Sequence, residues 1–352
     1  MQQDMAKHNL YMKRCLQLAA NGLGLVYPNP MVGSVIVYND RIIGEGWHRK
    51  AGEAHAEVHA IEAVKEKELL SQSTLYVNLE PCSHYGKTPP CADLIIKSKI
   101  KKVVIGSVDT NDKVVGKGIK RLKEHGVEVV YPVMEKACRE LNKRFYTYHE
   151  KNRPYVILKW AQSKDGFIFP DMNQAESGSP FWISNSYSLQ RVHQLRSEEA
   201  AILVGKKTVL QDNPKLNLRH FEGNSLVRIT IDRKLEIPKD KNFFDHSVPT
   251  IIYNEKTDVQ TENLYYVRLD FNKNLIHQIM SHLCGMEIQS LIIEGGAYTL
   301  KSFIDAGLWD EARVFEGDQI FKEGIKSPVL ATSSCAKQKV VNDVMYLYKN
   351  NN

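Results

Sequence analysis

Residues 54–59 read AHAEVH and residues 81–91 read PCSHYGKTPPC, and these two stretches decide the fold of the first half of the chain. Between them they supply one imidazole, one carboxylate and two thiols, carried by His55, Glu57, Cys82 and Cys91. Three protein ligands leave zinc a fourth position for water, and the metal lowers the pKa of that water toward about 7. The set predicts a zinc site, with His55, Cys82 and Cys91 as ligands, where hydroxide attacks an amino-bearing ring carbon.

Glu57 is expected to stay off the metal, because hydrolytic deamination needs a proton taken from the water and delivered to the departing ammonia. H-x-E followed by P-C-x-x-C is the signature of zinc deaminases. In this chain Cys91 lies nine positions after Cys82 instead of three, so residues 83–90 are expected to form a loop between two ligands. A helix from about Ala54 and a second helix opening near Cys91 would bring the groups to one point.

Other histidines near the motif offer weaker metal sites. His55 and His59 are spaced like a metalloprotease pair, but the glutamate of HAEVH stands at the third position, whereas H-E-x-x-H requires the second. His48 and His84 have no partner at ligand spacing, and we expect them to face solvent or substrate.

Around the motif, apolar runs alternate with helix-like stretches, which is typical of an α/β layered sheet. Strands are expected at 31–38, 74–78, 102–107 and 127–130, with helices from about 54, 91 and 117. An amphipathic segment over 133–148 leads into Lys151-Asn152-Arg153-Pro154, where polarity and a proline favour a boundary. Two domains are predicted, 1–150 and 151–352.

The second half reads as another α/β unit. Strands are expected at 155–161, 200–204, 226–231, 250–253 and 291–293, a helix at 297–306 and a final strand at 340–347. Residues 291–296, LIIEGG, form a strand pattern ending in paired glycines, which let a phosphate approach backbone N–H groups at a helix start, although such a pair is more often only a tight turn. Neither G-x-G-x-x-G nor G-x-x-x-x-G-K-[ST] occurs, so a dinucleotide would need another fold.

Composition narrows the class of protein. The chain has 352 residues, of which 43% are hydrophobic and 25% charged, as in soluble globular proteins of two domains. No apolar run reaches the about 18 residues of a membrane span and no signal peptide is recognisable, so a cytoplasmic protein without membrane contact is expected. Six cysteines are too sparse for a disulfide framework. The net charge of +6 is spread along the chain, which favours small phosphorylated ligands over nucleic acid.

Residues 27–33, YPNPMVG, precede the first motif, and the long PCSHYGKTPPC loop follows it. With these segments the chain closely resembles the bifunctional deaminase-reductase family of riboflavin biosynthesis, from about residue 8 to 325. The resemblance implies a cytidine-deaminase-like three-layer α/β/α domain followed by a dihydrofolate-reductase-like α/β domain. It also implies zinc-dependent deamination of a diaminopyrimidine ribosylamino phosphate, then reduction of the ribosyl side chain to ribityl with NADPH. One Zn²⁺ per deaminase site and NADPH would be the cofactors.

The resemblance extends to particular residues of the second half. Residues 159–166, KWAQSKDG, match the family's first strand and turn, and residues 204–214, VGKKTVLQDNP, match its next motif. NADPH contacts are implied at Ala161, Trp182, Thr208, Asp212, Gly296, Ala297, Tyr298, Thr299 and Leu300. Substrate contacts are implied at Lys159, Arg196, Leu216, Arg219 and Glu294. Arginines suit the phosphate of the substrate, and Lys206, Lys207 and Arg233 would favour the 2′-phosphate of NADPH.

Residues 109–112 read DTND where the family has DPNP, and no loss of activity is inferred from this difference. A second departure keeps an alternative open, because Pro180 replaces the serine that usually stands two positions before Trp182. A deaminase-only protein with a reductase-like scaffold is therefore one alternative. A nucleic-acid base deaminase is the other, although the TPPC loop and the absence of a basic stripe argue against it. A homo-oligomer, either a dimer or a tetramer, is expected.

Overall fold

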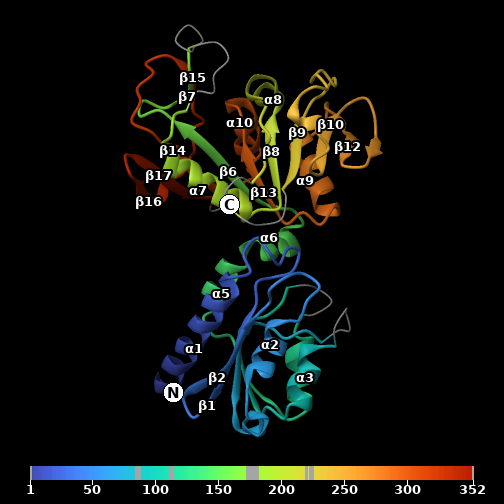
Figure 1. Ribbon diagram of the computed structural model, residues 1–352, viewed down its shortest axis with the longest axis vertical. Helices are drawn as coiled ribbons and strands as arrows, with labels where there is room; N and C mark the ends of the chain where they lie inside the picture. The colour runs from blue at the N-terminus through green and yellow to red at the C-terminus, as the bar shows by residue number, and fades with distance from the viewer. Residues whose placement is uncertain are drawn as a thin grey trace. The chain divides into compact units, whose positions relative to one another are not determined.

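The computed structural model describes residues 2–83, 89–110, 115–171, 182–218, 221 and 226–350. Contacts divide the chain into two compact units, Met1–Asn152 and Arg153–Asn352 (Figure 1). Each unit has its own main sheet and its own clusters of buried apolar side chains. Each therefore has the core that a separate domain needs.

The first unit is built on a five-stranded sheet in the order β2-β1-β3-β4-β5. The strands are β1 (Gly33–Tyr38), β2 (Arg41–Trp47), β3 (Thr74–Leu79), β4 (Lys102–Ser107) and β5 (Glu128–Val130). β1 is antiparallel to β2 and β3, whereas β3, β4 and β5 are parallel. Leu79 pairs with Ser107 at the ends of β3 and β4, so the segments that follow these strands leave the sheet at the same edge.

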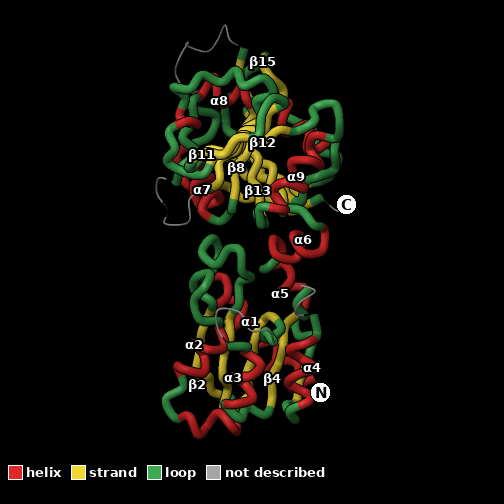
Figure 2. Tube along the Cα trace, turned by 90° about the vertical axis from the view of Figure 1, so that its right-hand side faces the viewer, coloured by secondary structure: helices red, strands yellow, loops and turns green. Residues whose placement is uncertain are grey.

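Helices cover both faces of this sheet, which gives three layers (Figures 1 and 2). They are α1 (Gln2–Ala20), α2 (Ala56–Ala63), α3 (Cys91–Lys97), α4 (Lys117–Glu124), α5 (Glu135–Leu141) and α6 (Lys143–Lys151), with a 3₁₀ helix at Lys67–Gln72. Successive side chains of a strand point to opposite faces. Ile36 of β1 accordingly belongs to the core with Ala60 of α2, and Val35 to the core with Met12 of α1.

Helix α2, which carries the first motif, lies very close to strand β2. A Cβ atom on Gly44 would lie 2.3 Å from the carbonyl oxygen of Ala60, and one on Gly46 would lie 2.5 Å from the Cβ of His59. Any side chain at these two positions would push the helix away from the strand. The two glycines therefore set the position of the α2 N-terminus against the sheet.

The second unit contains a ten-stranded sheet in the order β11-β12-β10-β9-β8-β13-β6-β14-β17-β16 and a two-stranded sheet of β15 and β7. The strands are β6 (Tyr155–Gln162), β7 (Phe167–Pro170), β8 (Ala201–Gly205), β9 (Val227–Ile231), β10 (Thr250–Asn254), β11 (Val259–Thr261), β12 (Leu264–Arg268), β13 (Ser290–Glu294), β14 (Glu311–Glu316), β15 (Gly324–Lys326), β16 (Ser334–Val340) and β17 (Asp343–Lys349). The inner strands from β12 through β14 are parallel, and antiparallel pairs occur toward both edges.

Helices also cover both faces of the large sheet. They are α7 (Ser186–Ser197), α8 (Lys206–Asp212), α9 (Leu275–Gly285) and α10 (Ala297–Asp305), with a 3₁₀ helix at Asn242–Phe244. Leu195 of α7 and Val209 of α8 pack on one face, and Ile279 of α9 and Phe303 of α10 pack on the other. Parallel strands that are covered on both faces have nearly continuous apolar sequences, as in residues 201–204, AILV. Among the described residues, no helix combines the length and the apolar character needed to cross a membrane.

The expected final strand over 340–347 is confirmed over 343–347, where β17 lies, but its predicted start is too early. Strand β16 ends at Val340, Val341 adopts a positive φ of 60°, and β17 begins at Asp343, so a tight hairpin interrupts the expected segment. The sequence of β16, SCAKQKV, has few apolar residues because the strand lies at the edge of the sheet. Such an edge strand lacks the alternation by which strands are recognised.

Candidate functional site

The residues of the first motif meet at the start of two helices. His55 is the residue immediately before α2, with extended backbone angles, and Glu57 lies in the first turn of that helix. Cys91 is the first residue of α3, and Cys82 lies three residues after the end of β3. His55 was expected inside the first turn of α2, but it lies one residue before the helix begins.

The three expected ligands lie close enough to share one metal ion. One donor atom from each of His55, Cys82 and Cys91 lies within 4.8 Å of the other two. The Nδ1 atom of His55 is 3.3 Å from the sulfur of Cys91 and 3.5 Å from that of Cys82. One imidazole and two thiols form a borderline-soft donor set, which suits zinc and does not suit calcium or magnesium. The residues present therefore fit a zinc ion.

The electrostatics of the cluster favour a thiolate at Cys82. A hydrogen bond from Cys91 and contacts with His55 hold the pKa of Cys82 well below its usual range, although burial opposes this. The backbone N–H of Cys91, at the N-terminus of α3, also donates to the Cys82 sulfur over 3.3 Å. The hydrogen bond with Cys82 in turn raises the pKa of His55 to about 8. A thiolate beside an imidazole and a helix start is ready to bind a cation.

Glu57 is buried next to the cluster without belonging to it. Its side chain is 3% exposed, and burial raises the pKa of its carboxyl group to about 6. The Cys91 thiol interacts directly with this carboxyl group. A carboxylate beside the donor atoms can exchange protons with a group held there.

His48 was expected to face solvent or substrate, and the solvent-facing placement is wrong. The residue is only 2% exposed, and its ring meets the ring of His55 edge to face at 5.4 Å between centroids. Its two nitrogens are hydrogen-bonded to the carbonyl oxygen of Ala54 and the side chain of Asn29. His48 therefore packs behind the candidate ligand and holds the segment before α2. His84 lies outside the described residues.

Glu80 is a buried functional candidate that the sequence analysis missed. It is 4% exposed, and its two carboxylate oxygens accept hydrogen bonds from four backbone N–H groups. Oε1 accepts from Gly118 and Ile119 over 2.9 and 3.1 Å, and Oε2 accepts from Asp109 and Gly116 over 3.3 and 3.0 Å. The carboxylate thus binds the N-terminus of α4 two residues before Cys82. Its position beside Pro81-Cys82 is the one sequence signal that could have pointed to it.

Replacing Glu80 with alanine is expected to lower zinc affinity by about 10- to 100-fold, as happens when groups that orient metal ligands are removed. Four N–H donors lose their acceptor, and the Cys82 segment loses its connection to α4. Zinc content after dialysis against a graded chelator measures the effect. Glu124→Ala, at an exposed position of α4, is the matched control. Equal zinc retention in both variants would show that Glu80 does not position the site.

A second charged cluster lies in the second unit. Lys159 of β6 and Glu294 of β13 are register partners on adjacent parallel strands, and their charged atoms lie 3.6 Å apart. Arg196 of α7 donates Nε and Nη2 to the two oxygens of Glu294 over 2.9 and 2.7 Å. All three side chains are at most 15% exposed. The pairing of β6 with β13 and the last turn of α7 thus place two cations, Lys159 and Arg196, beside the carboxylate of Glu294.

Burial and neighbouring charges have opposite effects on the pKa values of Glu294 and Lys159. Burial alone would raise the pKa of Glu294, but the charges of Arg196 and Lys159 lower it to about 2. Burial lowers the pKa of Lys159 despite the attraction of Glu294. Glu294 is therefore ionised near neutral pH and compensates the two buried cations.

The other residues expected at the cofactor lie at the ends of neighbouring parallel strands, where open α/β sheets bind ligands. α8 follows β8 and carries Thr208 and Asp212, while α10 follows β13 and begins at Ala297. A Cβ on Gly205 would lie 2.5 Å from Thr299 Oγ1, and one on Gly296 would lie 3.9 Å from Thr208 Oγ1. The β8–α8 and β13–α10 turns therefore lie side by side.

The remaining expected residues differ in exposure. Tyr298 is 86% exposed and Trp182 is 56% exposed, whereas Leu216 is 6% exposed with a positive φ of 50°. Ala161, near the end of β6, is partly buried. Leu300 is fully buried in the apolar core, so its side chain has no face toward a ligand.

Several residues singled out from the sequence lie outside the described residues or already have charged partners. Arg219, Asn111, Asp112 and Pro180 lie outside the described residues. Lys206 is paired with Glu236, and Arg233 with Glu255. A cofactor phosphate at either cation would have to compete with these exposed pairs.

The fold and the first site define a zinc-dependent deaminase unit, joined in one chain to a second α/β unit with a charged site of its own. Residues 5–107 match the family model described as the cytidine and deoxycytidylate deaminase zinc-binding region, and residues 154–321 match the RibD C-terminal domain. The chain belongs to the RibD family, the bifunctional deaminase and reductase enzymes of riboflavin biosynthesis. The resemblance and the fold class inferred from the sequence are confirmed, and Zn²⁺ and NADPH are the cofactors consistent with the two domains.

Similar proteins match over most of their length. The riboflavin biosynthesis protein RibD of Aquifex aeolicus is 41% identical over 323 residues, covering 90% of this chain and 88% of that protein. The Escherichia coli protein is 34% identical over 322 residues, covering 87% and 86%. A Thermotoga maritima diaminohydroxyphosphoribosylaminopyrimidine deaminase/5-amino-6-(5-phosphoribosylamino)uracil reductase superposes with a TM-score of 0.88 at 34% identity over 99% of both chains.

Proposed function

We propose that the first unit deaminates diaminohydroxyphosphoribosylaminopyrimidine and that the second reduces 5-amino-6-(5-phosphoribosylamino)uracil, the compounds named for the Thermotoga maritima relative. The observation that carries the proposal is the convergence of His55, Cys82 and Cys91 beside the buried carboxyl group of Glu57. Both substrates are small phosphorylated pyrimidines, which agrees with the dispersed positive charge of the chain.

In the deamination step His55, Cys82 and Cys91 would hold the metal. Bound zinc supplies Lewis acidity, which makes water a nucleophile near neutral pH. Glu57 takes a proton from the attacking water and delivers it to the departing amino group, so that water enters and ammonia leaves. His48, packed against His55, and Glu80, bound to the start of α4, hold the surrounding segments.

In the reduction step, NADPH when bound would supply a hydride, and a proton from solvent would complete the two-electron reduction that opens the ribosyl ring to ribityl. Arg196 uses Nε and Nη2 for Glu294, which leaves its Nη1 group free to donate to the substrate. Lys159, in strand β6, has further ammonium hydrogens that can donate to the substrate. Leu216 and Arg219 complete the proposed substrate contacts. The proposed cofactor contacts are Ala161, Trp182, Thr208, Asp212 and the residues from Gly296 to Leu300, with Leu300 contributing no side-chain contact.

The expected homo-oligomer, a dimer or a tetramer, stays a prediction.

A mass-resolved assay tests both activities and their order. The zinc-loaded protein is incubated with the diaminopyrimidine phosphate, first without and then with NADPH. A gain of about one mass unit without NADPH, followed by a further gain of about two with it, is expected. A first gain without the second would support a deaminase-only protein. No gain under either condition would reject the proposed function.

Removal of zinc is expected to stop the deamination step and to spare the reduction step, because the candidate ligands lie in the first unit. The reduction is measured as NADPH oxidation with the deaminated compound supplied directly. Adding Zn²⁺ back should restore deamination, whereas Mg²⁺ should not, because magnesium prefers oxygen ligands. Deamination that persists in protein shown to be metal-free would contradict the zinc mechanism.

A further inference from the structure

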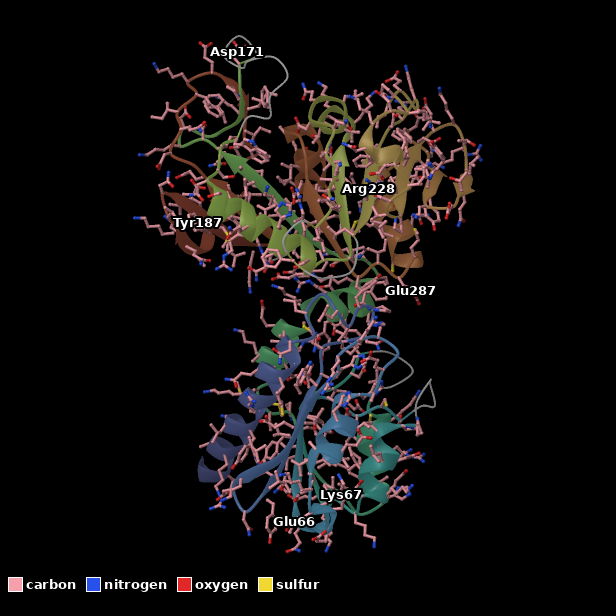
Figure 3. All side chains as sticks on the ribbon, in the orientation of Figure 1. Glu66, Lys67, Asp171, Tyr187, Arg228 and Glu287 are labelled. Atoms are coloured by element: carbon pink, nitrogen blue, oxygen red, sulfur yellow. The ribbon has the colours of Figure 1, made fainter. Side chains whose placement is uncertain are left out.

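Arg228 is a charged side chain buried in the sheet of the second unit. It lies in β9, whose sequence is VRITI (Figure 3). The residue is 0% exposed. Arginine is almost never fully buried unless its donors are satisfied. Neither of the two charged clusters described above includes it, so its retention in the core needs another explanation.

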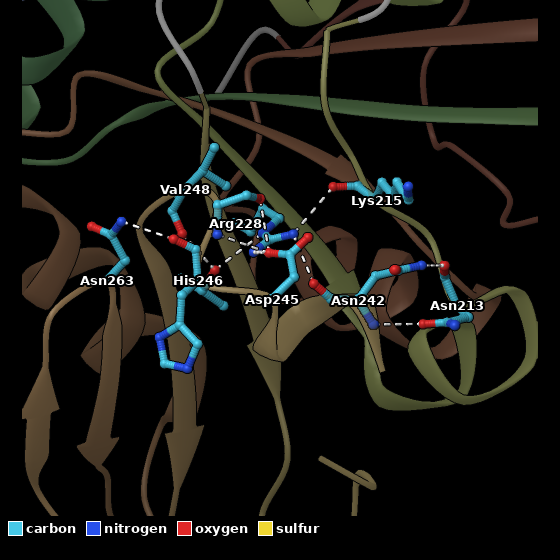
Figure 4. A network of polar contacts seen from close by, with 10 residues as sticks. Asn213, Lys215, Arg228, Asn242, Asp245, His246, Val248 and Asn263 are labelled. Atoms are coloured by element: carbon cyan, nitrogen blue, oxygen red, sulfur yellow. Dashed lines mark hydrogen bonds and ion pairs between the residues drawn. The ribbon is translucent and has the colours of Figure 1, made fainter. Parts of the chain in front are cut away.

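The guanidinium group connects three separate segments of the chain (Figure 4). Nε donates to Thr250 Oγ1 over 3.0 Å, and Nη2 donates to Asp245 Oδ1 over 2.6 Å. Nη1 donates to the backbone carbonyl oxygens of Asn242 and Lys215 over 2.9 and 3.4 Å. Arg228 therefore ties the 242–250 segment and the segment that follows α8 to the same strand.

Asn242 strengthens the connection to the segment after α8. Its backbone N–H donates to Asn213 Oδ1 over 2.8 Å, and its side-chain amide donates to the carbonyl oxygen of Asn213 over 2.5 Å (Figure 4). Lys241 donates to the carbonyl oxygen of Leu210, in the last turn of α8, over 3.3 Å. The 242–250 segment, together with Lys241, thus holds the end of α8 and the residue after it by both backbone and side-chain bonds.

The segment held in this way needs outside support. Residues 213–218 belong to no helix or strand, and two of them, Asn213 and Leu216, have positive φ angles of 42° and 50°. Positive φ is unfavourable for a side chain such as leucine, so surrounding contacts must enforce it. Asp212, immediately before this segment, and Leu216, within it, are proposed contacts of NADPH and substrate.

We infer that Arg228 and Asn242 are positioning residues of the reductase site, which act by fixing the path of the chain from Asp212 to Leu216. The inference rests on the proposed reductase function, because the roles of Asp212 and Leu216 belong to it. Neither Arg228 nor Asn242 is among the proposed contacts of NADPH and substrate. Their effect is transmitted through Asn213 and through the Lys215 carbonyl group.

The test compares two asparagine-to-alanine substitutions in the full-length protein. Asn242→Ala removes the side-chain bond to Asn213. Asn263→Ala, its matched control, removes a bond of the same kind to the His246 carbonyl oxygen on the far side of the network (Figure 4). We expect Asn242→Ala to weaken NADPH binding, or to lower reductase kcat/KM, by about 10- to 100-fold, as small misplacements of binding groups do. Asn263→Ala should leave both at the wild-type level, and deamination should be unchanged in both variants.

A second pair of variants separates positioning from general stability. Asn213→Asp keeps the oxygen that accepts from Asn242 N–H, whereas Asn213→Ala removes it. Measured well below each variant's unfolding temperature, Asn213→Asp should retain NADPH affinity better than Asn213→Ala. If Asn242→Ala lowers the unfolding temperature but binds NADPH and turns over like Asn263→Ala, the inference is overturned. Wild-type protein that neither binds NADPH nor reduces the uracil compound would overturn the proposed function, and the inference with it.

Discussion

Replacing Glu57 with glutamine is expected to lower the rate of deamination by about 10²- to 10⁴-fold, the usual contribution of a positioned acid–base group. Glutamine keeps the size of the side chain in a site that is 3% exposed, but it can neither take up nor deliver a proton. The initial rate of the one-mass-unit gain measures the effect. Reduction of directly supplied deaminated compound should proceed as in the wild type.

The matched control is Glu62→Gln, at an exposed position of the same helix α2. Zinc content must be equal in both variants, since Glu57 is expected to act beside the metal and not to bind it. If Glu57→Gln retains the wild-type rate with full zinc content, Glu57 is not the proton-transfer group. If zinc is lost, Glu57 contributes to the metal site, contrary to the proposal.

Replacing Glu294 with glutamine is expected to reduce reductase kcat/KM by about 100-fold and to destabilise the second unit by about 3–5 kcal/mol, because removal of one partner leaves buried charges uncompensated. Lys159 and Arg196 would then repel each other, and they would lose the negative charge and one of the two acceptor oxygens that orient them. NADPH oxidation with the deaminated compound measures the first effect, and denaturant unfolding measures the second. Deamination in the first unit should be unchanged.

The pH dependence of stability gives an independent measurement of the same carboxylate. Its pKa is depressed from 4.5 to about 2 in the folded protein. The stabilising contribution of Glu294 is therefore fully present above about pH 4.5 and is lost as the pH falls toward 2. Glu294→Gln should flatten the unfolding free energy of the second unit over this window. Glu262→Gln, at an exposed turn position, should behave like the wild type, and an identical profile in both variants would contradict the assigned charge state.

Much of the first site could be predicted from the sequence, because its chemistry depends on residue types at short spacings. His55 and Glu57 are two residues apart at a helix start, so local geometry alone places them near each other. Cys82 and Cys91 are nine residues apart, and this spacing alone does not place their side chains near each other. Their meeting depends on β3 and α3 packing in the same unit.

The second site was less predictable, because its members lie far apart in the chain. Lys159 and Glu294 were named from family resemblance, whereas their contact follows from the parallel pairing of β6 and β13. Nothing in the local sequence indicated Arg228, since a single charged residue in an apolar run has no periodicity. The one sequence signal for Glu80 was its position beside Pro81-Cys82. Their roles depend on which backbone groups the tertiary fold brings within hydrogen-bonding distance.

The sequence by itself determined the donor types, the alternating α/β elements and the family, because these depend on residue identity and on repeats of two and 3.6 residues. The tertiary structure alone decided which strands are neighbours, that His48 is buried behind His55, and that residues 334–349 form an edge hairpin. Pairing between distant strands and the burial of isolated polar groups are set by packing of the whole unit. They are therefore not encoded in any short stretch of the chain.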